Sequence, residues 1–123
     1  MKKIVVGFIP PILGVEGKFN TFRIGGFYNK NLKEGDEVFL LNEKEKAVFG
    51  IARVESVEIG RLDEMCILHG DMNHGELANI SNDAPQKLFK TIQKIYGPHI
   101  APPQKLTTVL YLQRINDGEK SSA

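Results

Sequence analysis

Two stretches decide the fold expected for this chain: Gly17-Lys18-Phe19-Asn20-Thr21-Phe22-Arg23 and, shortly after it, Leu32-Lys33-Glu34-Gly35-Asp36-Glu37-Val38. The apolar and β-branched run over residues 19–24 predicts a strand, and Gly35-Asp36 predicts a turn that leads into a second strand over residues 37–42. A strand, a glycine turn and another strand in close succession are typical of a small β-barrel.

The remainder of the chain adds three strands. Residues 3–9, 47–59 and 106–115 are rich in β-branched and aromatic residues. The charged residues 43–46 predict a hairpin between the strands 37–42 and 47–59, and Gly50 predicts a bulge where the sheet bends. The strand 106–115 contains neither Gly nor Pro, so it is able to lie in the middle of a sheet.

Residues 84–96 predict the main helix. Asp83 precedes it as a capping residue, Gly97-Pro98 ends it, and an apolar stripe runs along one face: Leu88, Phe89, Ile92, Ile95 and Tyr96. A shorter helical turn is predicted over residues 61–68. The expected fold class is α+β, a small mixed β-barrel with one main packed helix and short helical turns.

Length and composition limit what this fold can do. We assign residues 1–116 to a single domain and residues 117–123 to a disordered tail. Lys and Arg total 16 against 15 Asp and Glu, so an anion site has to be local and not a broad basic surface. The single cysteine, Cys66, excludes an intramolecular disulfide and is expected to be a semi-buried, small apolar residue in a reducing compartment.

The chain contains no apolar stretch that approaches the roughly 20 residues of a membrane span. Its apolar start is interrupted by Pro10 and Pro11, which suits a first strand better than a signal peptide. We therefore expect no membrane partner and a cytoplasmic location. The oligomeric state is left open.

The first quoted stretch also carries the candidate site. Alternate residues of a strand share a face, so Thr21 and Arg23 point together while Phe22 and Ile24 point the other way. If Phe22 and Ile24 enter the core, Thr21 and Arg23 line an outer groove. The planar fork of Arg23 suits a phosphate or carboxylate, and Lys18 adds a compact charge. The alternative is that Lys18 and Arg23 are solvated surface charges and Thr21 is an ordinary strand residue.

Two neighbours of this motif have open interpretations. In Gly25-Gly26-Phe27-Tyr28 an aromatic ring either stacks on a ligand or forms part of a turn with Phe27 inward and Tyr28 half-exposed. Arg53 either faces the groove or pairs with a glutamate across the sheet.

A metal site is not predicted. His69, Asp71 and His74 lie close in sequence, but their spacing fits no common zinc pattern. We interpret them as a polar loop and expect no metal and no cofactor.

The Lys18, Thr21 and Arg23 motif, the Gly35-Asp36 turn, the strand around Gly50 to Val57 and the helix that ends at Tyr96 together resemble the ASCH domain, a member of the PUA-like superfamily. This resemblance implies a groove that holds RNA, a nucleotide or a modified nucleoside. Some small bacterial ASCH proteins are amidohydrolases that act on acetylcytidine with a lysine, a threonine and a glutamate. Here Lys18 and Thr21 match the first two, and Asn73 occupies the position of the acid, with Asp71 or Glu76 as possible substitutes.

The function predicted from the sequence is binding of RNA or a nucleotide-derived ligand, through the following residues: Lys18, Arg23, Tyr28, Arg53, Asn73 and His74. An alternative is amidohydrolysis of an acylated nucleoside with Lys18, Thr21 and Glu76 as catalytic residues. A second alternative is a protein-interaction module without catalysis.

Overall fold

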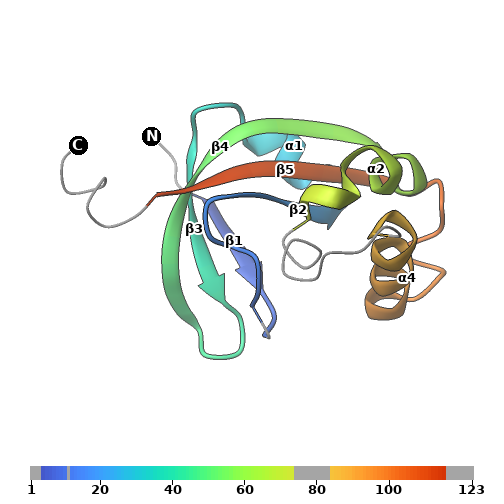
Figure 1. Ribbon diagram of the computed structural model, residues 1–123, viewed down its shortest axis with the longest axis horizontal. Coiled ribbons are helices and arrows are strands. Elements are labelled where there is room, and N and C mark those ends of the chain that lie inside the picture. Colours follow the sequence, from blue (N-terminus) through green and yellow to red (C-terminus); the bar gives the residue numbers. More distant parts are fainter. Residues whose placement is uncertain (1–3, 11, 74–83, 116–123) are drawn as a thin grey trace.

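The fold is built around one curved sheet, in a computed structural model that describes residues 4–10, 12–73 and 84–115. Within these residues, five strands form the sheet in the order β1-β3-β4-β5-β2 (Figure 1). β1 pairs with β3 in parallel and the other pairs are antiparallel, so β1 and β2 are the two edges. The strands are β1 (Ile4–Phe8), β2 (Lys18–Ile24), β3 (Glu37–Asn42), β4 (Ala47–Arg61) and β5 (Leu106–Ile115). The predicted strands and the interior position of the last one are confirmed.

The sheet curls into a half-barrel because the long strand β4 bends. Its first part runs beside β3, and its second part turns to run along β5 (Figure 1). The register shifts once between Leu40 and Leu41 of the partner strand, opposite Gly50 and Val48, and again between Val54 and Ser56. The bulge predicted at Gly50 is confirmed, and an added Cβ at this position would displace the Arg114 guanidinium.

Three helices and one 3-10 turn complete the described fold: α1 (Phe27–Asn31), α2 (Leu62–His69), η1 (Gly70–Met72) and α4 (Ala84–Tyr96). The main helix has the predicted bounds, and Gly97 ends it with φ 88° while its N–H donates to the Gln93 carbonyl at 2.7 Å. The short helical turn is confirmed as α2. The proposed cap, Asp83, lies outside the described residues.

Two apolar clusters occupy opposite faces of the sheet. The cluster inside the half-barrel includes Phe8, Phe19 and Leu112, and the second cluster joins Phe22 and Val109 of the sheet to α2 and α4. In Figure 1, α2 and α4 lie together at one end of the sheet. β2 therefore has both faces covered, which explains why four consecutive residues in it, 19–22, are buried.

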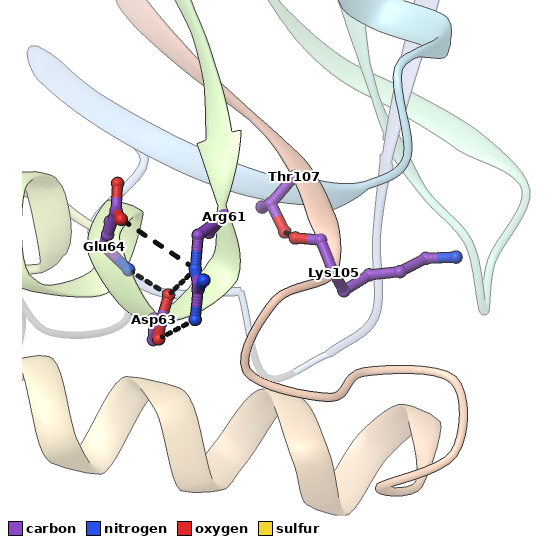
Figure 2. A network of polar contacts seen from close by, with 5 residues as sticks. All are labelled: Arg61, Asp63, Glu64, Lys105 and Thr107. Atoms are coloured by element: carbon purple, nitrogen blue, oxygen red, sulfur yellow. Dashed lines mark hydrogen bonds and ion pairs between the residues drawn. The ribbon is translucent and has the colours of Figure 1, made fainter.

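A polar corner positions α2 directly after β4. Arg61 donates from Nε and Nη2 to the two Asp63 carboxylate oxygens at 3.0 and 2.9 Å (Figure 2). Asp63 and Glu64 lie in the first turn of α2, where negative charge suits the helix dipole. The Leu62 and Asp63 N–H groups donate to the carbonyls of Lys105 and Pro103, so this corner is tied to the proline-rich loop before β5.

Cys66 is 2% exposed in α2, more deeply buried than the sequence predicted, and its thiol is expected to be inert. Burial, with a smaller contribution from the Asp63 carboxylate, raises the pKa of the thiol to about 12. At pH 8 the thiolate fraction is then roughly a thousandfold below that of an ordinary cysteine. We expect Ellman's reagent to modify Cys66 slowly in the folded protein and rapidly in 6 M guanidinium, where the pKa is normal. Rapid modification of the folded protein would contradict this placement.

None of the described helices is long and apolar enough to cross a membrane. The predicted tail, residues 117–123, lies outside the described residues.

Candidate functional site

The two edge strands, which are not hydrogen-bonded to each other, border a cleft of about 810 Å³. β1 forms one wall and β2 another, and α4 closes the cleft from the far side. Its polar lining residues, tyrosines included, come from five separate segments: Thr21, Arg23, Tyr28, Glu43, Asn73, Thr91 and Tyr96. The volume lies in the range of small-molecule sites.

Arg23 is held in a fixed orientation on one wall. Its Nε–H donates to Thr21 Oγ1 at 3.2 Å, and its Cζ lies 4.8 Å from the centroid of the Phe8 ring. Within the described residues, these contacts leave the two terminal nitrogens without a hydrogen-bond partner. Because those nitrogens form the fork that matches a phosphate or carboxylate, Arg23 is oriented for a bidentate anion contact.

The charge of Arg23 is not matched by an ion pair among the described residues. Burial lowers the pKa of the guanidinium from its ordinary value, and the nearby Tyr28, Tyr96 and Glu43 oppose that shift. A desolvated cation without a carboxylate partner is unfavourable, and an incoming anion would relieve that cost.

Tyr28 and Tyr96 flank this cation from two helices. The Tyr28 hydroxyl donates to the Val5 carbonyl at 3.1 Å, which ties α1 to β1. Tyr96, at the end of α4, is 41% exposed and free to contact a ligand. Phe27 is 62% exposed, so the alternative that places it inward is wrong for this residue. Tyr28 is half-buried, as that alternative expects. The short helix α1 exposes the Phe27 ring and packs the Tyr28 ring against the inner cluster.

Lys18 is not brought to Thr21 and Arg23. Positions 18 and 21 differ by an odd number, so their side chains lie on opposite faces of β2. The Lys18 side chain is 69% exposed and its Nζ lies 3.7 Å from Glu55 Oε1, away from the residues that line the cleft. The predicted grouping is therefore corrected to Thr21 and Arg23. Thr21 itself is 1% exposed and accepts the Arg23 hydrogen bond.

The other predicted ligand residues divide into three groups. Asn73 is buried, lines the cleft and forms a β-bridge with Asn20. Arg53 is exposed, does not line the cleft, and lies opposite Glu37 in the sheet, which matches the cross-strand alternative. His74 and Glu76 lie outside the described residues.

The histidine region does not assemble a metal site in the part of the chain that is described. No group of three metal-binding side chains occurs there. His69 instead contacts the Tyr111 hydroxyl through Nδ1 at 2.7 Å, and its carbonyl accepts from Asn20 Nδ2 at 2.7 Å. These contacts tie α2 to the sheet on the face opposite Arg23.

Glu43 and Tyr96 are site residues that the sequence did not indicate. Tyr96 belonged to the apolar stripe of the helix and Glu43 to a charged hairpin turn. The polar tip of a tyrosine at a helix end was a weak signal for Tyr96. For Glu43 the necessary information is the parallel pairing of β1 with β3, which brings the turn after β3 to the end of β1.

No protein-family model and no curated protein matches the sequence. Solved structures with a similar fold include the following three. The hypothetical protein PH0355 superimposes with a TM-score of 0.67 and 14% identity over 93% of this chain and 100% of that chain. Protein EF3133 from Enterococcus faecalis, of the family DUF984, has a TM-score of 0.56 and 14% identity over 91% and 70%.

The third is a mutant of the protein ZmASCH from Zymomonas mobilis, with a TM-score of 0.54 and 15% identity over 98% of this chain and 78% of that chain. Identities this low concern the fold and not the activity. The five-stranded half-barrel with α2 and α4 at one end gives this chain the ASCH fold.

Proposed function

We propose that the cleft binds a nucleotide, free or as a unit of RNA, with its phosphate on Arg23. The observation that carries this proposal is the desolvated Arg23 fork, which lacks an ion pair among the described residues and faces a cleft with aromatic walls. An anion satisfies the fork, and Tyr28 and Tyr96 offer rings and hydroxyls to the remainder of the ligand. The net charge of +1 suits a single nucleotide contact better than a long RNA footprint.

The amidohydrolase alternative gains no support from the described residues. A threonine nucleophile needs a base within hydrogen-bond reach, and Lys18 lies on the other face of β2. Thr21 Oγ1 is engaged by Arg23. In our proposal, Thr21 is a positioning residue that orients the guanidinium. The interaction-module alternative and the cytoplasmic location remain predictions.

Calorimetry with the intact protein tests the proposal. We expect cytidine monophosphate (CMP) to bind at least tenfold more tightly than cytidine, because a charged hydrogen-bonded contact contributes about 1.5–3 kcal/mol. Equal affinities for CMP and cytidine, or no binding of either, would exclude the proposed role of Arg23. A titration with a short cytidine oligonucleotide distinguishes a free nucleotide from RNA as the ligand, since tighter binding of the oligomer points to RNA.

The purified protein also allows a direct test of the amidohydrolase alternative. The wild type and Thr21→Val are incubated with acetylcytidine and the products are separated by chromatography. We expect no deacetylation by either protein, and for Thr21→Val a loss of CMP affinity of about 1 kcal/mol, roughly fivefold. Product from the wild type that disappears in Thr21→Val would instead support the hydrolase alternative.

A further inference from the structure

Glu43 lines the cleft from a segment that is distant in sequence from Arg23. It follows the last residue of β3 and opens the turn to β4. Its N–H donates to the Phe8 carbonyl at 2.9 Å, which fixes the turn to the end of β1. Glu43 lines the cleft, whereas its turn neighbours Lys44, Glu45 and Lys46 do not.

The turn that carries Glu43 is held by Asn42. Asn42 Oδ1 accepts from the N–H groups of Lys44 and Glu45 at 3.0 and 3.1 Å, and its Nδ2 donates to Glu45 Oε1 at 3.0 Å. Lys46 completes the turn with a φ of 56°. The backbone at Glu43 is thus preorganised, and a ligand does not have to order it.

Gly7 provides the space that directs the Glu43 side chain over β1. A Cβ at position 7 would lie 2.7 Å from Glu43 Cδ and 2.8 Å from Oε1, closer than real contacts allow. Because Gly7 also lines the cleft, the carboxylate rests on bare backbone at the cleft surface. Any larger residue in place of Gly7 would displace it.

The two charged side chains that line the cleft, Arg23 and Glu43, do not pair with each other. Glu43 is near enough to oppose the fall in the Arg23 pKa, yet the two side chains form no ion pair. Within the described residues, the Glu43 carboxylate also has no hydrogen-bond donor. The cleft is therefore lined by a donor fork on β2 and by an unengaged acceptor in the turn after β3.

We propose that Glu43 selects the base of the bound nucleotide by accepting a hydrogen bond from an exocyclic amino group. This inference rests on the proposed nucleotide binding and names the substrate class: nucleotides whose base carries its amino group at C4 of a pyrimidine or C6 of a purine, which are cytosine and adenine. An ionised carboxylate is an acceptor only, so it pairs with the amino group of cytosine or adenine. It repels the carbonyl oxygen that uracil or hypoxanthine presents at the same position.

The test compares CMP with uridine monophosphate (UMP), which differ at that exocyclic group, by calorimetry on four proteins. For the wild type we expect CMP to bind at least tenfold more tightly than UMP. In Glu43→Gln the side-chain amide can turn to donate or accept a hydrogen bond. The ratio of the affinities for CMP and UMP should then be no more than about twofold. Gly7→Ala should lower the ratio in the same way, because it displaces the carboxylate without removing its charge. Glu34→Gln, which removes an exposed glutamate outside both the cleft and this turn, should keep the wild-type ratio.

The outcomes separate the two proposals. CMP and UMP that bind the wild type equally, or a preference for CMP that survives in Glu43→Gln, would overturn the role of Glu43 and leave nucleotide binding intact. Failure of the wild type to bind either nucleotide would overturn both proposals. Glu43 is exposed, so Glu43→Gln should fold normally; a circular dichroism melt of Gly7→Ala checks that variant.

Discussion

Replacing Arg23 with glutamine is expected to weaken CMP binding by about 2–3 kcal/mol, roughly 30- to 150-fold at 25 °C. Gln keeps much of the side-chain length and can still contact Phe8 and Thr21. It lacks the positive charge and the paired donors of the fork. Binding of cytidine, which carries no phosphate, should change much less.

A second variant separates charge from geometry. Arg23→Lys keeps the charge but not the planar fork, and it cannot reproduce the stacked contact with Phe8 at 4.8 Å. We expect its CMP affinity to lie between those of the wild type and Arg23→Gln. Equal affinities of the wild type and Arg23→Lys would show that a point charge is sufficient.

The matched control for Arg23→Gln is Arg53→Gln. Arg53 is an exposed arginine on β4 that lies outside the cleft, so its loss removes the same net charge from the protein. We expect it to reduce CMP affinity by less than about twofold at 0.15 M salt, where the Debye length is about 8 Å. Similar losses in the two variants would assign the anion effect to overall charge and not to the cleft.

The strands and the main helix were predictable because their signals are local. Residues 84–96 combine a 3.6-residue apolar repeat with a Gly-Pro stop, and residues 106–115 form an uninterrupted β-prone run. The bends were partly predictable as well: Gly50 marks a bulge because Arg114 occupies the space that a side chain would need. Arg114 then donates to the carbonyls of Phe49 and Val15, a long-range contact with no sequence signature.

The candidate site was predictable only where it lies within one strand. Thr21 and Arg23 share a face by the period of two, and that part of the interpretation agrees with their contact in the structure. The same rule places Lys18 on the opposite face of β2. The prediction grouped Lys18 with Thr21 and Arg23 because the three residues are close in sequence, and that grouping is wrong. The stripe of α4 was also only partly core: Leu88 and Ile92 are buried, whereas Ile95 and Tyr96 are 62% and 41% exposed at the edge of the cleft. How far a helix is covered is set by the tertiary fold.

A large effect on stability is expected from Phe19→Ala. Phe19 is 0% exposed within the half-barrel, and its ring meets the Phe8 ring edge to face, with centroids 6.4 Å apart. Truncation of a buried phenylalanine costs about 3–5 kcal/mol. Since small domains have a free energy of unfolding of about 5–15 kcal/mol in total, urea denaturation should show a much lower midpoint.

Phe27→Ala removes the same atoms from an exposed position and is the control. Phe27 is 62% exposed on α1 and contacts the Tyr28 ring at 5.2 Å between centroids. We expect its free energy of unfolding to fall by less than about 1 kcal/mol. Equal losses in Phe19→Ala and Phe27→Ala would mean that position 19 is not in the core and that the face assignment of β2 is wrong.

Phe19→Ala should also weaken CMP binding while the protein is still folded. Phe8 lies between Phe19 on one side and the Arg23 guanidinium on another, so it transmits packing from the core to the site. A cavity at position 19 gives the Phe8 ring room to move, and Arg23 then loses the surface that holds its fork in place. We expect a several-fold loss of CMP affinity in Phe19→Ala at low temperature and none in Phe27→Ala. If the folded Phe19→Ala protein bound CMP like the wild type, the orientation of Arg23 would depend on Thr21 alone.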